Sequence, residues 1–242
     1  MATLPQIKRP GPKTQTAIDE GRTVFTNLRE NPAETHAKGL RVLKLSSNKK
    51  LGKVITRGEF AGRRMVTLTL EERKTCPVSC HHWETCYGNN LHRAVRIGTV
   101  GLEAALEKDL AGLIEKYPEG IHVRLHVTGD FFSVGYVAFW RRMLKRYPDA
   151  LSVFGYTARK PSSDIGRAVE RLNLAAGSRC RIRFSQNQES TSARPGRVFA
   201  AREDFDADKS FVCPQQTGKV ASCADCAVCW SGSARTLRFL TH

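Results

Sequence analysis

The sequence lacks any long hydrophobic segment, since no apolar stretch approaches the roughly 20 residues that a membrane-spanning helix needs. It also lacks an apolar segment near its start, where Lys8, Arg9 and Lys13 lie, so we expect no secretory signal. These two absences argue against a membrane protein and a secreted protein, and they predict a soluble protein of the cytoplasm. In that reducing compartment clustered cysteines bind metal more often than they form disulfides.

Acidic side chains are scarce relative to basic ones. The chain has 23 Asp and Glu residues against 39 Lys and Arg residues, and its formal net charge is +16. Such a charge attracts nucleic acid or another polyanion, which is therefore a candidate partner. The alternative is that the charge only maintains solubility, because the basic residues are spread along the chain and form no compact motif.

Composition and hydrophobic periodicity divide the chain of 242 residues into three parts. Residues 1–38 are rich in Pro, Thr, Asn and charge, and they predict a mobile basic arm with one short helix near 16–28. Residues 39–200 predict an α/β domain that carries the first group of cysteines. Residues 201–242 predict a cysteine-rich extension packed on that domain.

Strand and helix patterns alternate within the central part. Strands are expected at 41–45, 51–56, 64–70, 121–127, 151–156, 179–185 and 197–200, and helices at 102–117, 133–147 and 163–172. The later segments have the short connections that are typical of βαβ units. The predicted fold class is therefore α/β, as an open parallel sheet or a partial (β/α) barrel-like arrangement.

Seven of the eight cysteines fall into two clusters. The first follows the predicted strand 64–70 with the spacing C-x3-C-x5-C and consists of Cys76, Cys80 and Cys86. The second has the spacing C-x9-C-x2-C-x2-C and consists of Cys213, Cys223, Cys226 and Cys229. Groups of three and four thiolates predict metal binding. The eighth cysteine, Cys180, lies in a predicted strand and is interpreted as a core residue.

The donor set favours iron–sulfur clusters over zinc. Three cysteines suit a [4Fe–4S] cluster with one open iron, whereas a structural zinc ion needs a fourth ligand. Zinc is the alternative, because four tail thiolates suit a closed tetrahedral site, and His81 or His82 would complete the first one. We expect two clusters, one at each group of cysteines, and a single shared cluster is the other arrangement.

Two predicted strands carry basic residues at alternate positions. These are His122, Arg124 and His126 in the strand 121–127, and Arg179, Arg181 and Arg183 in the strand 179–185. If the strands are central, unpaired charge there is costly unless an anion is bound. The candidate anion-binding or substrate-binding residues are therefore Arg124, His126, Arg181 and Arg183. The alternative is that these strands lie at a sheet edge with one face in solvent.

Polar residues follow the strand 121–127, at the end of the strand where parallel α/β sheets bind ligands. Gly129 allows a close backbone approach, and Asp130 is a candidate contact for a ligand amine or hydroxyl. We expect the loop with Cys76 at the same rim. The alternative is that Asp130 is a turn or capping residue.

Four separated motifs resemble a known family. They are the runs 74–87 and 124–133, the pair Tyr156-Thr157 and the C-terminal CADCAVCW. In this order they resemble the bacteriophage gene product 88 domain family, over roughly residues 40–232. The resemblance implies a phage origin and a place in the host cytoplasm, and it implies no biochemical role.

More loosely, the order of strand, three-cysteine loop, helix and strand ending in Gly-Asp resembles radical S-adenosylmethionine enzymes. This resemblance implies that Cys76, Cys80 and Cys86 hold a [4Fe–4S] cluster. It also implies that Gly129 and Asp130 contact the amine of S-adenosylmethionine, and that the tail cysteines hold an auxiliary cluster. The spacing C-x3-C-x5-C differs from the C-x3-C-x2-C that is usual in those enzymes.

The sequence thus predicts an iron–sulfur protein, and one form of it is a radical S-adenosylmethionine-like enzyme acting on an anionic substrate. The alternative is a non-catalytic iron–sulfur or zinc protein that binds nucleic acid or a host protein through its basic surface. Neither the cysteine spacing nor the alternation of basic residues distinguishes an enzyme from a binding protein.

Overall fold

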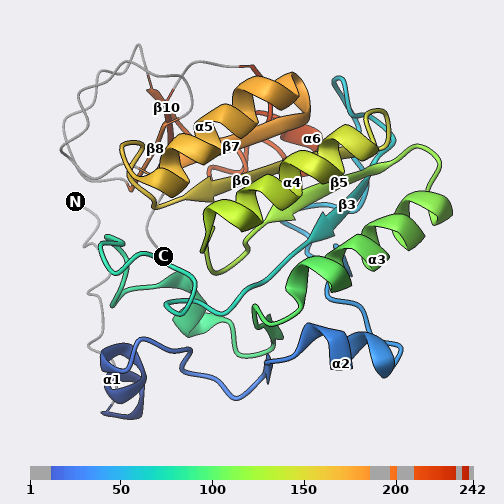
Figure 1. The fold of residues 1–242 in the computed structure, drawn as a ribbon. Helices are drawn as coiled ribbons and strands as arrows, with labels where there is room; N and C mark the ends of the chain where they lie inside the picture. Colours follow the sequence, from blue (N-terminus) through green and yellow to red (C-terminus); the bar gives the residue numbers. More distant parts are fainter. Residues whose placement is uncertain (1–11, 186–196, 201–209, 233–235, 240–242) are drawn as a thin grey trace.

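The computed structural model describes residues 12–185, 197–200, 210–232 and 236–239 (Figure 1). Its centre is an eight-stranded sheet with the strand order β2-β3-β5-β6-β7-β8-β10-β9. β2 is antiparallel to β3, and the other adjacent pairs are parallel. The strands are β2 Lys44–Leu45, β3 Arg64–Thr67, β5 Ile121–Leu125, β6 Leu151–Thr157, β7 Cys180–Ser185, β8 Arg197–Ala200, β9 Ser210–Val212 and β10 Thr236–Phe239.

Three helices connect the central strands. α3 (Leu102–Lys116) precedes β5, α4 (Val134–Arg146) joins β5 to β6, and α5 (Asp164–Ala176) joins β6 to β7. Because strands that follow one another along the chain are neighbours in the sheet, right-handed connections place all three helices on one face (Figure 1).

The sequence determines where α4 and α5 begin. Ser133 and Ser163 are their N-cap residues, and each side-chain oxygen accepts a hydrogen bond at 3.0 Å from a backbone N–H in the first turn. The apolar side chains of α4 recur at helical spacing, so that Val137, Trp140 and Leu144 are all buried. Both helices were expected, at 133–147 and 163–172.

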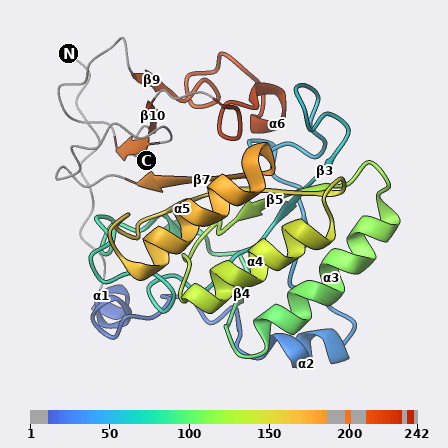
Figure 2. The same ribbon diagram turned by 45° about the horizontal axis from the view of Figure 1, so that its top comes forward.

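Different parts of the chain cover the two faces of the sheet (Figure 2). On one face the helices α3, α4 and α5 pack against apolar strand residues such as Val123 and Val153. On the opposite face Met65 and Phe154 pack against the C-terminal tail. The tail contributes Cys213, Ala224, Cys229 and Trp230 to this second core. The sheet is therefore buried on both sides, as parallel sheets generally are.

The predicted fold class is confirmed as an open α/β sheet. Its edge strands are β2 and β9, which do not pair with one another, so the described strands form no closed barrel. β5 lies between β3 and β6, and β7 lies between β6 and β8. The two strands with basic residues are thus central, and the expectation of an exposed edge is excluded for them.

The N-terminal part is more ordered than expected. Residues 12–38 contain α1 (Pro12–Asp19), β1 (Leu28–Arg29) and α2 (Pro32–Ala37), and β1 pairs with β4 (Arg96–Ile97). Burial of Ala17 and Ile18 attaches α1 to the rest of the molecule, which amphipathic spacing over so short a segment did not reveal. The expected helix at 16–28 is therefore misplaced, and the mobility predicted for residues 1–11 lies outside the described residues.

Two further differences concern strands. The segment 51–56 was expected as a strand but forms a single bridge, between Val54 and Arg64. β10 was not expected, yet it lies between β8 and β9 in the main sheet. The tail is therefore continuous with the sheet and is not an appendage beside it. Among the described residues, none of the helices combines the length and apolar character that a membrane crossing needs.

Candidate metal centre

The first three cysteines lie on the long loop that follows β3, beside the carboxyl ends of the central strands (Figure 1). Arg73, with a φ of 65°, holds this loop together from inside. Its guanidinium donates hydrogen bonds to the Trp83 carbonyl oxygen at 3.1 Å and to Asn89 Oδ1 at 2.6 Å. It also donates to the carbonyl oxygen of Arg22 at 3.2 Å, which joins the loop to the N-terminal segment.

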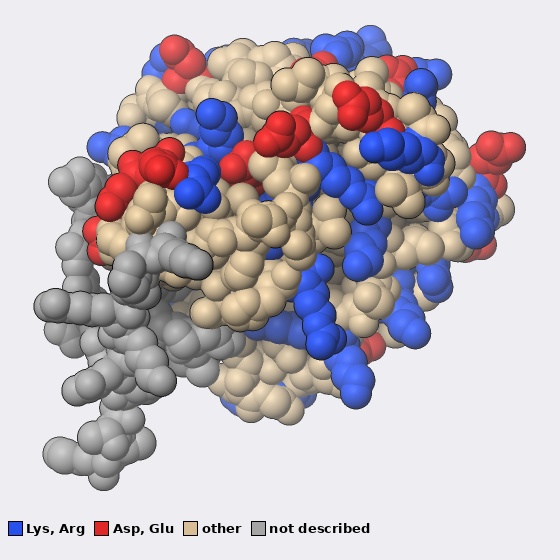
Figure 3. All heavy atoms as spheres, turned by 90° about the horizontal axis from the view of Figure 1, so that it is seen from below, with Lys and Arg blue, Asp and Glu red and all other residues tan. Residues whose placement is uncertain are grey.

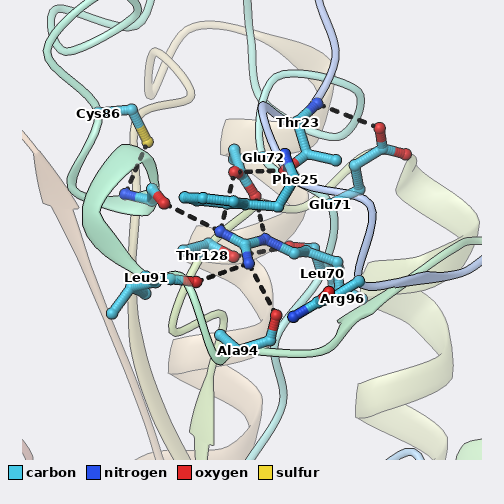
Figure 4. A network of polar contacts seen from close by, with 12 residues as sticks. Thr23, Phe25, Leu70, Glu71, Glu72, Cys86, Leu91, Ala94, Arg96 and Thr128 are labelled. Carbon is cyan, nitrogen blue, oxygen red and sulfur yellow. Dashed lines mark hydrogen bonds and ion pairs between the residues drawn. The ribbon is translucent and has the colours of Figure 1, made fainter. Parts of the chain in front are cut away.

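A buried ion pair fixes the far end of the loop (Figure 4). The Arg96 guanidinium donates to both carboxylate oxygens of Glu72, at 3.1 and 3.2 Å, and neither side chain is exposed. The same guanidinium donates to the carbonyl oxygens of Gly88, Leu91 and Ala94 at 2.7–2.9 Å. One charged side chain thereby determines the path of the chain just after Cys86.

The N-terminal segment closes over this ion pair. The Thr23 hydroxyl donates to Glu72 at 2.7 Å, and the Phe25 ring lies 4.6 Å from the Arg96 guanidinium (Figure 4). Charge that is buried in this way is stable only when every charged group has a partner, and here both have. The ion pair therefore anchors the ends of the loop in the interior, whereas most residues between the two ends are exposed or half-buried.

Asp130 and Gly129 fix the start of the loop. The Thr75 hydroxyl accepts a hydrogen bond from the Asp130 backbone N–H at 3.1 Å, and the Arg159 guanidinium donates to the Thr75 carbonyl oxygen at 2.6 Å. Gly129 has a φ of +82°, and an added Cβ would lie 2.6 Å from Leu70 Cβ and from Thr75 Oγ1. The glycine thus permits the close approach of two strand ends.

The Asp130 carboxylate has structural partners of its own. One oxygen accepts from the backbone N–H of Phe131 at 2.7 Å, and the other accepts from that of Ala158 at 2.8 Å. Burial raises the pKa of Asp130 to about 6 in spite of these bonds. The structure therefore gives Gly129 and Asp130, the predicted cofactor contacts, a role in joining β5, β6 and the cysteine loop.

The three thiols of the loop are half-buried, and each of them has a raised pKa. Burial is the largest cause that raises the pKa of Cys76, Cys80 and Cys86. The charges of Cys80 and Cys86 add to the shift of Cys76, and that of Cys80 adds to the shift of Cys86. The thiols of this loop therefore interact electrostatically, although they do not form a ready ligand set.

Two hollows border this loop. One, of about 440 Å³, lies between Pro77 and Ser79 of the loop and Arg159 and Lys160. The other, of about 520 Å³, has Cys76 in its wall. Small molecules therefore have access to the loop from solvent.

The tail cysteines converge beneath the opposite face of the sheet. Cys213 and Cys229 are buried, and α6 (Cys223–Cys226) is a single turn that carries a cysteine at each end. Burial raises the pKa of Cys223 to about 12, and the charges of Cys229 and Cys213 add to this shift. Three of the four predicted tail ligands are thus mutual neighbours, and Cys226 lies one turn away.

The basic face of the central strands lies against these tail cysteines. Arg183 donates from Nε to the Cys229 carbonyl oxygen at 3.0 Å and from Nη2 to that of Val228 at 3.1 Å. The Arg124 guanidinium lies 4.6 Å from the centre of the Tyr156 ring, and Tyr156 packs in the same core as Cys229. Burial lowers the pKa of both arginines.

His126 and Arg181, the other two predicted anion-binding residues, do not contact the tail as Arg183 does. His126 has a φ of 57°, which turns its ring out of strand alternation and against Phe131 and Tyr136. Burial lowers the pKa of His126 to about 3, so the ring is neutral at physiological pH and does not act as a cationic anion contact. Arg181 is partly exposed, and its Nε has no hydrogen-bond partner among the described residues.

All eight cysteines lie in the described residues, and all are free thiols. Within these residues no three His, Cys, Asp or Glu side chains already have the arrangement of a metal site. The donor chemistry nevertheless fits a thiophilic metal, since two groups of neighbouring thiols lie in largely buried surroundings. Metal binding at either group requires deprotonation of the thiols and rotation of their side chains.

Two other candidate ligands have hydrogen-bond partners of their own. The Cys180 thiol is buried and donates to Asn173 Oδ1 at 3.4 Å, as a core cysteine does. His82 Nδ1 lies 3.2 Å from the Thr85 hydroxyl. Sequence analysis did not identify Glu72 or Arg96 as supports of the loop. The sequence feature that could have identified Glu72 is the charged run 71–74 directly after a buried strand. Such a run ordinarily indicates a solvated turn.

Lys and Arg side chains are spread over the face seen from below in Figure 3, and acidic side chains lie mostly in the upper half of that view.

Neither a family model, nor a curated protein, nor a solved structure matches the chain. The resemblances to the gene product 88 family and to radical S-adenosylmethionine enzymes therefore stay predictions.

Proposed function

We propose that this chain is an iron–sulfur protein of the cytoplasm with a [4Fe–4S] cluster on Cys76, Cys80 and Cys86. The observation that carries the proposal is the loop itself, in which three neighbouring thiols are held by buried arginines at the carboxyl ends of a parallel sheet. A loop that only connects two secondary-structure elements would not require the buried ion pair of Glu72 and Arg96.

The tail cysteines would hold a second cluster. Cys213, Cys223 and Cys229 lie together under the sheet, and Cys226 supplies a fourth thiol from the same turn as Cys223. Four thiolates close a site, whereas the three of the first loop leave one iron open. A zinc ion in the tail is the alternative occupant.

A reduced cluster with an open iron supplies a low-potential electron to a ligand bound there, as in the radical S-adenosylmethionine enzymes that the order of motifs resembles. In this chain Arg73, Arg96 and Arg159 would orient the three thiols. The hollow that Cys76 lines would admit the ligand. An enzymatic activity on an anionic substrate is the finer form of the proposal.

Anaerobic purification with absorption spectroscopy and iron, sulfide and zinc analysis tests the proposal. We expect a brown protein whose iron falls by about half in the triple variant Cys76→Ser, Cys80→Ser, Cys86→Ser, since one of two clusters is lost. Cys180→Ser is the matched control and should keep all iron.

The enzymatic form is tested on the same preparation, by release of 5′-deoxyadenosine from S-adenosylmethionine after reduction with dithionite. A colourless, iron-free chain from oxygen-protected cells would contradict the proposal and leave a zinc protein, or a basic protein that binds nucleic acid, in its place. Intact clusters without 5′-deoxyadenosine would remove only the enzymatic form.

A further inference from the structure

Arg124 occupies an unusual position for a charged residue. It lies on β5 in the middle of the sheet and faces the C-terminal tail, with its guanidinium over the rings of Tyr156 and Phe154 at 4.6 and 5.5 Å. Its Nη1 donates to the carbonyl oxygen of Leu125 at 2.6 Å. Among the described residues it makes no ion pair with a carboxylate.

Such an arrangement is costly for the protein by itself. Arg124 is only half-buried, but a cation that is largely removed from water without a counter-charge still opposes folding, which is why such charges are normally paired. The same fold satisfies that rule at Arg96, which has Glu72 as its partner. The rings of Phe154 and Tyr156 that Arg124 covers pack in one core with Cys223 and Cys229, and these two thiols are among the groups whose charge acts on Arg124.

The thiols are the groups that gain charge when metal binds. Metal binding removes their protons, and four thiolates around a divalent metal ion or a cubane leave a net charge of about −2. A second cation, Arg183, holds the backbone of the same turn through the carbonyl oxygens of Val228 and Cys229. Tyr156, whose ring lies under the Arg124 guanidinium, packs in the same core as Cys229.

We propose that the anion facing Arg124 is the protein's own metal–thiolate centre in the tail, and that Arg124 is a positioning residue that neutralises this centre. This inference rests on the proposed metal site of the tail. It changes the sequence-based assignment, because Arg124 then serves a resident cofactor and not a diffusible substrate. The cation and the thiolates compensate each other only in the loaded protein.

The test uses the full-length chain with serine at Cys76, Cys80 and Cys86, so that the tail is the remaining thiol cluster. Co²⁺ is titrated against a chelator and followed by its thiolate charge-transfer absorption. Arg124→Gln should bind Co²⁺ about tenfold more weakly or worse, and Arg124→Lys, which keeps the charge, within about threefold of the parent. Arg142→Gln, on exposed α4, changes the net charge equally and should have no effect.

Metal-free melting temperatures separate this role from a structural one. Without metal, Arg124→Gln should melt at the same temperature as the parent or higher, because an uncompensated charge has been removed. A lower metal-free melting temperature, or failure to fold, would assign Arg124 to structure and overturn the inference. Equal Co²⁺ affinity in Arg124→Gln and the parent would overturn it as well.

The outcome for the proposed function is read separately. If the parent tail binds no Co²⁺ and the unaltered chain contains no iron or zinc, the proposed metal site fails, whatever Arg124 does. If the parent binds metal and the arginine variants do not differ, only the role of Arg124 fails.

Discussion

Gly129 lies where three segments meet, and its missing side chain is what allows them to do so. Its φ of +82° disfavours other residues, and the space that a Cβ would need is taken by Leu70 and Thr75. The residue therefore brings the end of β5 close to the start of the cysteine loop. Gly129 thus has a structural role, and contact of Gly129 and Asp130 with a cofactor stays a prediction.

We predict that Gly129→Ala destabilises the protein by about 2–4 kcal/mol, since it adds backbone strain to overpacking. The matched control is Gly112→Ala in α3, where no atom lies within 4 Å of the added Cβ. That change should be neutral or stabilise by about 0.5–1 kcal/mol, because alanine is the better helix former. Urea unfolding measures both, and equal stability of the two variants would contradict this account.

At the scale of elements, the loop 74–91 shows how charged residues replace regular secondary structure. It contains one short helix, η1 (Tyr87–Asn90), so few backbone carbonyl groups find partners within it. Arg96 donates to two of them, those of Gly88 and Leu91, and to that of Ala94 just beyond the loop, and Arg73 donates to one more within the loop. Buried arginines thus donate hydrogen bonds to backbone carbonyl groups of this loop, as the N–H groups of neighbouring strands do in the sheet.

Loss of the buried counter-charge should release this loop. Glu72→Gln leaves Arg96 without a charged partner, and we expect it to cost about 3–5 kcal/mol in the free energy of unfolding. Glu103→Gln removes the partner of Arg142 from an exposed pair and should cost about 0–1 kcal/mol. Denaturant melts give the energies. Limited proteolysis with mass spectrometry should locate new cleavage in 74–91 for Glu72→Gln, and an unchanged cleavage pattern would argue against the anchoring role.

At the scale of the whole molecule, the sheet has a separate core on each face. The helix face is aliphatic and aromatic, whereas the tail face combines aromatic rings with thiols and basic groups. Trp230 is central to the second core, and its ring centroid lies 4.6 Å from that of His122 and 4.7 Å from that of Phe154. Docking of the tail therefore depends on this contact.

Trp230→Ala should cost about 3–5 kcal/mol, as large-to-small changes in a core do. Leu174→Ala, at a position that is 83% exposed on α5, should change stability by less than about 0.5 kcal/mol. Thermal melts compare the two variants with the parent, and hydrogen exchange should show the loss of protection concentrated in 210–232. A Trp230→Ala chain with parental stability would show that the tail is held by other contacts.

Local sequence signals determined much of this protein. Serine caps and apolar spacing located α4 and α5, and alternation of strand and helix gave the open parallel sheet. The same signals failed for β10 and for residues 12–38, because those segments are short and are stabilised by contacts distant in the sequence.

Only the tertiary structure decided which groups meet. Alternation along β5 placed Arg124 and His126 on the same face, but a left-handed φ at His126 separates them. Spacing identified two groups of cysteines, and the fold placed the second of them under the basic face of the sheet. Residue spacing carries information about neighbours along one element, whereas the meeting of β5 with the tail depends on how the whole chain packs.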